Sequence, residues 1–363
     1  MNVLFAPDWR QGVPYQRLLA EALETHGVHV SFLSHYKRVL PLMRLLKVNP
    51  TDLFHLHWPE AYYPRLRDRW DKFRRARFTV DLTLATRHTP YVLTAHNLCE
   101  HNLQDLPFAR VNYGTAYRRA DLVFAHSTTA KAKLVATYQV DESKIRVVPH
   151  GDLSVVMPPP IPRAEARAKL GLPDGPICLM FGAVEPYKGQ EEVLAYWKQA
   201  RPAARLVIVG KPDSAEYGET IRQFAADIPN VTLHFQWLSD AELALYLCAA
   251  DCALFNYRTI FTSGAASLAR SWGLPILMPT RLDTVDLAEP DPRVFRFEAF
   301  DDAFPAKLAA ALAIPPDYKS AGGWREQISW SRVAALTVAS YREVLGASNE
   351  KDSAATLTKA HSS

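Results

Sequence analysis

The stretch FTSGAASLARSWGLPI (261–276) has the residue types of a helix that begins at an anion-binding site. A small, polar, glycine-containing start leaves backbone N–H groups available, and a phosphate placed there gains hydrogen bonds and a favourable interaction with the helix dipole. The stretch contains no carboxylate, so we expect it to bind an anion and not to move a proton. The candidate contacts are Thr262, Ser263, Gly264 and Ala265.

A lysine in a second loop could bind the same anion. Lys188 lies in GAVEPYKG (182–189), directly after an apolar run that predicts a strand. Its ammonium group can pair with a diphosphate and stabilise the charge that grows on this group as it leaves. A surface lysine and an ordinary Ser/Thr helix cap are the alternative interpretations. Further candidate contacts lie in this loop and after later strands: Gly182, Glu185, Tyr187, Lys211, Trp237 and Leu238.

Candidate proton acceptors gather in the first half of the chain. Ten of the twelve histidines precede residue 151, and several lie near predicted strand ends. Glu60, in HLHWPE, follows a predicted strand beside Trp58, where partial burial would raise its basicity. His57 and His96 are the next candidates, because imidazole accepts protons near neutral pH. A surface position for Glu60 and a packing role for the histidines are the alternatives.

Two successive α/β segments must position these residues. In each half, short apolar runs bounded by turn residues alternate with helical stretches, which predicts parallel strands with crossover helices. The segment VVMPPPIPR (155–163) holds four prolines and predicts a stiff connector. We therefore expect one Rossmann-like domain over 1–155, a linker over 156–165, a second Rossmann-like domain over 166–330 and a disordered tail over 347–363.

Composition and charge describe a soluble protein with an anionic partner. The 363 residues are 48% hydrophobic and 22% charged, which fits two globular domains. Residues 1–160 hold 21 Lys and Arg against 14 Asp and Glu, a net charge of +7, whereas the remainder carries −3. Basic segments with interleaved aromatic or apolar residues, 62–77 and 35–47, suit an anionic membrane surface. A nucleic-acid face or a solvated helix is the alternative.

Cysteine content and the N-terminus predict a cytoplasmic protein. Four cysteines are few for this length, which fits reduced thiols, and we expect no metal at Cys248 and Cys252. The first residues lack a basic region followed by a long apolar segment, so neither a signal peptide nor a membrane-spanning helix is expected.

Six motifs carry a resemblance to a known family: GAVEPYKG, FQWLSDAELALYLCAAD, FTSGAASLARSWGLPI, DLFHLHWPE, YVLTAHNL and VVPHG. They resemble motifs of GT-B glycosyltransferases, most closely family 4 in the C-terminal half and, more specifically, bacterial exopolysaccharide β-mannosyltransferases of the xanthan type. The resemblance implies two Rossmann-like domains whose parallel sheets face each other across a cleft, and a helix over 331–346 that crosses back to the first domain. It further implies transfer of mannose from GDP-mannose to a polyprenyl-diphosphate-linked oligosaccharide at the cytoplasmic membrane. Such an acceptor favours a membrane surface over a nucleic acid as the partner. We expect no metal, because Lys188 and the helix N-terminus can take its place at the diphosphate.

Departures from the family 4 pattern bear on the mechanism. Ala183 stands where the family has an arginine that shares phosphate binding with the lysine, and Ile260 and Leu268 stand where it has two glutamates. Because those glutamates belong to retaining enzymes, we expect inversion, with a base from the first domain. The alternatives are a retaining family 4-like transferase using another nucleotide-sugar, a non-catalytic nucleotide-sugar binding protein, and a sugar-nucleotide epimerase.

Overall fold

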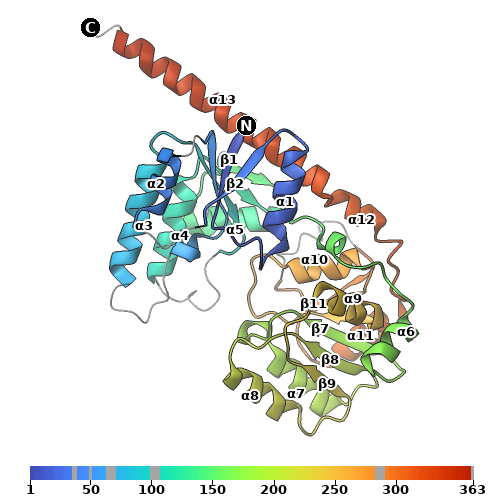
Figure 1. Ribbon diagram of the computed structural model, residues 1–363. Helices are drawn as coiled ribbons and strands as arrows, with labels where there is room; N and C mark the ends of the chain where they lie inside the picture. The colour runs from blue at the N-terminus through green and yellow to red at the C-terminus, as the bar shows by residue number, and fades with distance from the viewer. Residues whose placement is uncertain (35–38, 49–50, 63–70, 99–106, 283–290, 361–363) are drawn as a thin grey trace. The chain divides into compact units, whose positions relative to one another are not determined.

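The computed structural model describes residues 1–34, 39–48, 51–62, 71–98, 107–282 and 291–360, which form two compact units. Unit 1 comprises Met1–Gly151 together with Ile328–Ser363, and unit 2 comprises Asp152–Gln327 (Figure 1). The proline-rich segment that we expected to be a stiff connector belongs to unit 2, and Met157 and Ile161 pack against the apolar core of that unit.

Unit 1 contains a six-stranded parallel sheet with the order β2-β1-β3-β4-β5-β6. Every residue of β3, β4 and β5 is buried, as expected for parallel strands covered on both faces. The strands are β1 (Asn2–Ala6), β2 (His29–Phe32), β3 (Leu53–Leu56), β4 (Tyr91–Ala95), β5 (Leu122–Ala125) and β6 (Ile145–Val147). The helices are α1 (Pro14–Glu24), α2 (Pro41–Val48), α3 (Asp71–Ala85), α4 (Pro107–Arg119), α5 (Thr128–Tyr138) and α13 (Trp330–Ala360), with 3-10 turns η1 (Pro59–Tyr62) and η3 (Glu142–Lys144).

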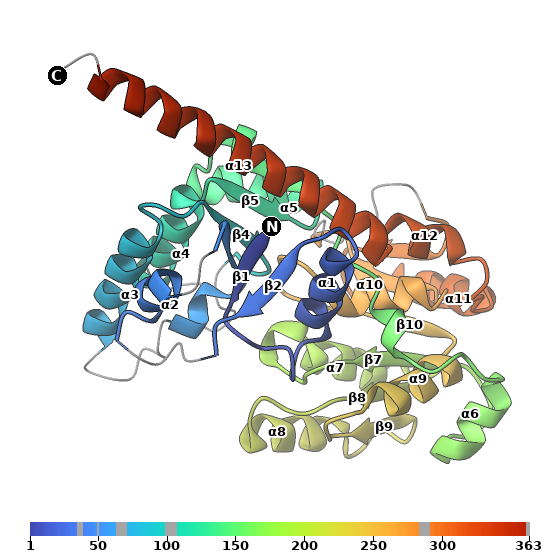
Figure 2. The same ribbon diagram turned by 45° about the horizontal axis from the view of Figure 1, so that its top comes forward.

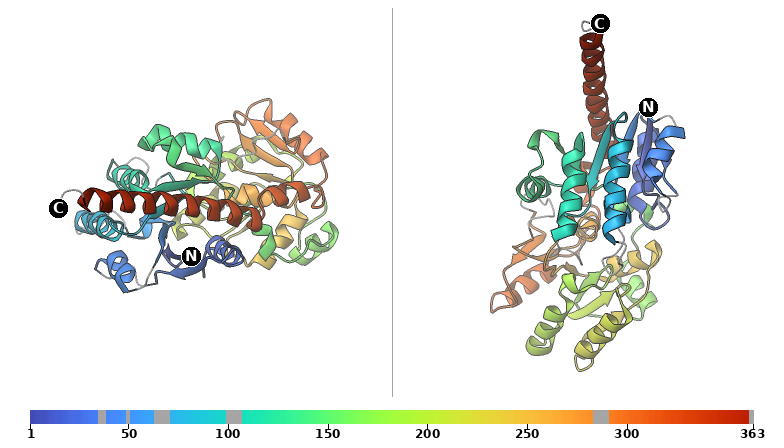
Figure 3. Two further views of the ribbon diagram at one scale, coloured as in Figure 1. Left: turned by 90° about the horizontal axis from the view of Figure 1, so that it is seen from above. Right: turned by 90° about the vertical axis from the view of Figure 1, so that its left-hand side faces the viewer.

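The last helix of the chain, α13, packs beside α1 in unit 1 (Figure 2). A hydrogen bond of 2.6 Å between the Tyr341 hydroxyl and His55 Nδ1 joins α13 to β3. The helix runs on to Ala360, where we expected a disordered tail from residue 347, and Figure 3 shows its second half extending beyond the sheet. The stretch after Gly346 contains neither glycine nor proline and has several good helix formers, which explains the continuation.

Unit 2 contains a second six-stranded parallel sheet, with the order β12-β11-β10-β7-β8-β9. Its strands are β7 (Ile177–Phe181), β8 (Arg205–Val209), β9 (Val231–His234), β10 (Cys252–Leu254), β11 (Ile276–Pro279) and β12 (Val294–Phe297). Its helices are α6 (Arg163–Leu170), α7 (Gln190–Ala200), α8 (Ala215–Ala225), α9 (Asp240–Ala249), α10 (Gly264–Ser271), α11 (Phe304–Ala313) and α12 (Gly322–Gln327), with 3-10 turns η4 (Leu153–Val156) and η5 (Pro186–Lys188).

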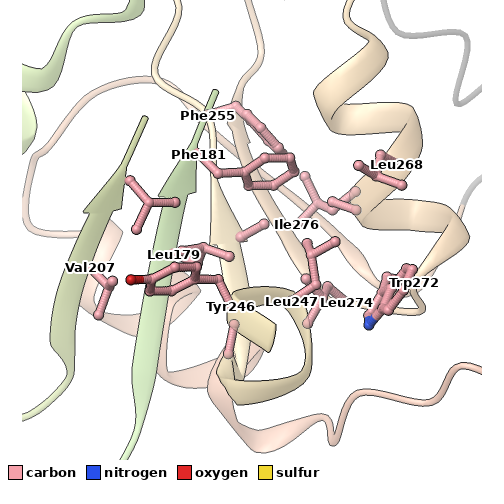
Figure 4. Packing of buried hydrophobic residues seen from close by; sticks show 14 of the residues in the cluster. Leu179, Phe181, Val207, Tyr246, Leu247, Phe255, Leu268, Trp272, Leu274 and Ile276 are labelled. Carbon is pink, nitrogen blue, oxygen red and sulfur yellow. The ribbon is translucent and has the colours of Figure 1, made fainter. Parts of the chain in front are cut away.

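Both faces of the second sheet are covered by helices. Along β7, alternate residues contribute to different apolar clusters: Leu179 faces the cluster formed with α6, α9 and α10, whereas Cys178 and Met180 face the cluster formed with α7, α8 and α11. Figure 4 shows the first cluster, in which Phe181 and Phe255 lie together above the strands. This alternation is the period of two that a strand imposes, and it explains why β7 is apolar throughout.

Each sheet has one point at which the order of its strands reverses. In unit 1 the chain builds β2 on one side of β1 and continues with β3 on the other side, and in unit 2 the corresponding pair is β7 and β10. Open parallel sheets bind ligands outside the carboxyl ends of the strands at such a point. The loops that follow β1, β3, β7 and β10 are therefore the first places to look for a site.

Candidate functional site

The loops after β7 and β10 are tied together at the reversal point of unit 2. Asn256 follows β10, and its side-chain Nδ2 donates a hydrogen bond of 3.0 Å to the carbonyl oxygen of Gly189. The backbone N–H of Arg258 donates to the carbonyl oxygen of Tyr187 at 2.6 Å. The predicted lysine loop and the segment that leads into α10 thus form one continuous surface.

Lys188 is a buried cation that forms no ion pair with any residue that the structure describes. Its exposed fraction is 8%, and among the described residues no carboxylate lies within 4.0 Å of its Nζ. Burial lowers the pKa of Lys188 to about 8, and the charge of Glu185 only partly offsets this effect. Nζ lies over Gly182, where an added Cβ would come within 3.0 Å of it, and 5.9 Å from the centroids of Tyr187 and Tyr257. An incoming anion would supply the missing partner.

The start of α10 offers backbone donors beside this loop. The Ser263 side chain caps the helix: its Oγ accepts from the backbone N–H of Ala266 at 3.1 Å and shares a hydrogen bond of 3.3 Å with the Tyr257 hydroxyl. The interpretation as an ordinary cap is therefore correct for the Ser263 hydroxyl. The backbone N–H groups of Gly264 and Ala265 have no acceptor among the described residues, and Thr262 precedes them, half-buried. These two groups are the donors left for an anion.

The remaining predicted contacts differ in how close they lie to Lys188. Glu185 and Tyr187 are in the same loop, half-buried. The backbone of Lys211 is joined to this loop, since its carbonyl oxygen accepts from Val184 N–H at 2.9 Å, although the Lys211 side chain is exposed. Trp237 and Leu238 follow β9, the edge strand two strands away from β7. The Trp237 side chain is 74% exposed, and Leu238 packs against the apolar cluster.

Arg281 is a second cation at this site, and we did not predict it. It follows β11, and its Nη2 donates to Asn256 Oδ1 at 3.2 Å and to the carbonyl oxygen of Tyr257 at 3.3 Å. Asn256 also contacts Gly189, so a single side chain separates Arg281 from the lysine loop. The available signal was its position after an apolar strand, and no motif surrounds it.

The two positions at which family 4 has glutamates belong to the apolar interior. Leu268, on α10, is 5% exposed and is a member of the cluster in Figure 4. Ile260 is half-buried and packs against the same cluster. A carboxylate at position 268 would be placed among aliphatic and aromatic side chains, where burial of a charge is costly.

In unit 1, aromatic side chains and Glu60 lie at the reversal point between β1 and β3. The rings of Trp9, after β1, and Trp58, after β3, stack with centroids 5.0 Å apart. Glu60, in η1, is half-buried, and its Oε2 accepts a hydrogen bond of 2.6 Å from the hydroxyl of Tyr113 on α4. Tyr113 was missed because only the folded chain brings α4 beside η1.

His57 and His96 lie deeper than we expected. Trp58 stacks on His96 at 4.2 Å between centroids, and the exposed fractions of His57 and His96 are 1% and 8%. Burial, with a further contribution from neighbouring imidazoles, lowers the pKa of both residues well below 6.5, so both are neutral at physiological pH. Of the three candidate proton acceptors, His57 and His96 are buried and Glu60 is the more accessible.

The predicted membrane-binding segments lie partly outside the described residues. The structure does not describe 63–70 of the first segment, 62–77, or 35–38 of the second, 35–47. Among the helices that the structure describes, none combines the length and apolar character needed to cross a bilayer.

Several known proteins are similar to this chain in sequence or in fold. The model of Glycosyltransferase Family 4 matches residues 2–152. This is the N-terminal half, whereas the motifs in the sequence resemble family 4 most closely in the C-terminal half. A GDP-mannose:glycolipid 4-beta-D-mannosyltransferase of Xanthomonas campestris pv. campestris is 25% identical over 311 residues, which cover 84% of this chain and 83% of the relative. A D-inositol 3-phosphate glycosyltransferase of Acidothermus cellulolyticus is 35% identical over 168 residues, which cover 44% of this chain and 36% of the relative. The solved structure of sucrose-phosphate synthase from Thermosynechococcus elongatus matches with a TM-score of 0.74 and 20% identity, covering 95% of this chain and 99% of that one.

Proposed function

Because the chain is a glycosyltransferase with the GT-B fold, we propose that it transfers mannose from GDP-mannose to a polyprenyl-diphosphate-linked oligosaccharide, with inversion, in exopolysaccharide synthesis. The Xanthomonas campestris mannosyltransferase supports this donor and a glycolipid acceptor, since its similarity extends over 84% of the chain. The feature that carries the proposal is Lys188, a buried cation near the start of α10 that pairs with no carboxylate in the described part of the chain.

We assign the donor diphosphate to unit 2. Lys188 provides one positive charge, and the N–H groups of Gly264 and Ala265 provide hydrogen bonds. Arg281 provides the second positive charge, which family 4 enzymes take from the position of Ala183 in this chain. Two cations and a helix N-terminus offset the charge that develops on the leaving diphosphate, so the transfer requires no divalent metal at this group.

We assign the acceptor and the base to unit 1. The acceptor hydroxyl oxygen attacks the anomeric carbon of mannose, the bond between this carbon and the diphosphate oxygen breaks, and GDP leaves with the bonding electrons. Glu60 takes the hydroxyl proton, because it is half-buried at the strand-reversal point whereas His57 is almost completely enclosed. Inversion is supported by Ile260 and Leu268, which replace the two glutamates by apolar side chains.

A lipid-linked acceptor places the reaction at the cytoplasmic face of a membrane. The net charge of +7 over residues 1–160 suits an anionic bilayer surface. We propose peripheral association through this basic half, with no nucleic-acid partner. Binding to vesicles that contain anionic lipid should therefore weaken as the salt concentration rises.

A transfer assay tests the proposal directly. The purified full chain is given a lipid-linked oligosaccharide and GDP-mannose, with UDP-glucose as the comparison donor, and nucleotide release and the anomeric configuration of the product are measured. We expect GDP release that depends on the acceptor, a β-linked product from the α-linked donor, and no increase in turnover when Mg²⁺ or Mn²⁺ is added. Absence of transfer from GDP-mannose would contradict the assigned donor, and acceptor-independent release of free sugar would indicate a different reaction.

A retaining transfer is the second candidate. The observation that favours it is the family 4 match over residues 2–152, together with the D-inositol 3-phosphate glycosyltransferase that is 35% identical over 168 residues. An α-linked product in the same assay would establish it. The stereochemistry therefore distinguishes the two candidates without any change to the protein.

A further inference from the structure

Unit 1 encloses a row of histidine rings that the proposed transfer does not require. Neighbouring rings in the row have centroids between 4.2 and 5.6 Å apart. Imidazole is an unfavourable core residue unless its nitrogens have partners. Two nitrogens, His57 Nε2 and His150 Nδ1, are buried and have no hydrogen-bond partner among the described residues. The row consists of His55, His57, His96, His126 and His150.

Three of these side chains converge on one point. His96, His126 and His150 each offer a ring nitrogen, and the three nitrogens lie within 4.8 Å of one another. The residues follow three neighbouring strands, β4, β5 and β6, so the sheet itself places them side by side. The aromatic ring of Tyr15, on α1, borders all three, with centroid distances of 4.8, 5.5 and 5.1 Å.

Hydrogen bonds aim ring nitrogens at this point. His126 Nδ1 donates to the carbonyl oxygen of Val148 at 3.0 Å, which leaves the lone pair on Nε2 of the neutral ring. This Nε2 faces His96 Nδ1 at 3.5 Å. The other nitrogen of His96, Nε2, lies 3.3 Å from His57 Nδ1. A ring whose second nitrogen is bound to a carbonyl or a neighbouring side chain is the usual arrangement of a metal-ligating histidine.

The spacing also matches that of metal ligands. With zinc–nitrogen bonds of about 2.0–2.1 Å at tetrahedral angles, two ligating nitrogens lie about 3.3–3.4 Å apart. The separation of 3.5 Å between His126 Nε2 and His96 Nδ1 is close to this value. The ligating nitrogen of His150 lies within 4.8 Å of those of His96 and His126.

We propose that His96, His126 and His150 bind one divalent transition-metal ion that prefers imidazole ligands, such as Zn²⁺. Three histidines leave one tetrahedral position for an oxygen ligand from water. Mg²⁺ and Ca²⁺ prefer sets of oxygen ligands and do not fit this group. The ion joins the loops after β4, β5 and β6 and so stabilises unit 1, independently of the proposed transfer.

The sequence did not indicate the site, because the histidines are 30 and 24 residues apart and no metal-binding motif has that spacing.

Cobalt provides the probe, because Co²⁺ in a tetrahedral site absorbs strongly in the visible range. The full chain, freed of any affinity tag and treated with a chelator, is titrated with Co²⁺ and then with Zn²⁺. We expect one Co²⁺ per chain, a tetrahedral spectrum that Zn²⁺ abolishes, and a dissociation constant of about 1 µM or lower. Zn²⁺ should also raise the Tm of the chain.

Matched variants locate the site. His126→Gln and His150→Gln should each weaken Co²⁺ binding by at least about tenfold. The same substitution at the exposed His26 and His29 should leave the titration unchanged. The proposal is overturned if the wild-type chain shows no tetrahedral spectrum, as expected if the rings only hydrogen-bond to one another, or if the His150→Gln and wild-type chains bind Co²⁺ equally well.

X-ray absorption of the Zn²⁺-loaded wild-type chain decides the matter if the variants do not fold. We expect three imidazole ligands around the ion. A coordination shell made only of oxygen atoms would overturn the proposal.

Discussion

Replacement of Lys188 by methionine should make the protein more stable and a poorer donor binder. Lysine ordinarily has a pKa of 10.5, and burial lowers that of Lys188 to about 8. Because each pKa unit corresponds to about 1.4 kcal/mol, a charged Lys188 costs the ligand-free protein about 3 kcal/mol at neutral pH. Methionine has a similar length and carries no charge, so Lys188→Met should remove this cost and raise the free energy of unfolding by up to about 3 kcal/mol.

The pH dependence follows from the direction of the shift. Between pH 8 and 10.5 the unfolded chain retains the Lys188 proton that the folded chain has lost, so the stability of the wild-type protein rises with pH across this window. Below pH 8 the cost is fully present. The stability advantage of Lys188→Met should therefore be largest at pH 7 and disappear toward pH 10.5.

Donor binding should change in the opposite direction. A hydrogen bond to a charged group contributes about 1.5–3 kcal/mol, so Lys188→Met should weaken GDP-mannose binding by roughly 10- to 150-fold. Wild-type affinity should also fall as pH rises above 8, whereas the affinity of Lys188→Met should not respond to pH in this range. Calorimetry measures the affinity for GDP-mannose. Urea denaturation, followed by tryptophan fluorescence, measures the free energy of unfolding.

A lysine on the surface of the same unit provides the control. Lys198, on α7, pairs with Asp227 at 3.5 Å and its side chain is largely exposed. Lys198→Met should therefore change neither the stability by more than about 1 kcal/mol nor the donor affinity. The reasoning is refuted if Lys188→Met lowers the stability at pH 7, or if it binds GDP-mannose as well as the wild-type protein does.

Three further substitutions test other parts of the two units. Leu268→Glu buries an unpaired charge and should lower the free energy of unfolding, measured in urea, by about 3 kcal/mol or more. Its product should remain β-linked. A stable variant with an α-linked product would contradict this prediction. Gly210→Ala should lower the Tm, because position 210 has φ of +141° and its Cβ would come within 2.0 Å of the Gly182 carbonyl oxygen. Gly323→Ala is the control: its added Cβ meets nothing within 4 Å, so its Tm should fall less than that of Gly210→Ala. Glu60→Gln should lower kcat about 10²- to 10⁴-fold in single-turnover assays with unchanged donor affinity, and full activity would exclude Glu60 as the base.

Local patterns were sufficient to predict the strands and the lysine loop. Apolar runs such as 177–181 and the glycine-bounded loop after them are signals within a few residues, and they correctly indicated parallel sheets and the place of Lys188. Arg281 was not predictable in the same way. It reaches the site only because β11 lies next to β10, and this order is set by crossovers that no short motif records.

The depth of the histidines depends on the far end of the chain. Positions 55, 57 and 96 were recognisable as strand ends, but the sequence around them does not reveal what covers them. His55 is bonded to Tyr341, 286 residues away, and Trp330 packs against Tyr15 with centroids 5.5 Å apart. At Gly151 an added Cβ would lie 2.5 Å from the Trp330 ring, so α13 approaches the end of the β6 loop as closely as a glycine allows. The returning helix therefore helps to enclose the histidines that follow the strand ends, which explains why these side chains lie deeper than the local sequence indicates.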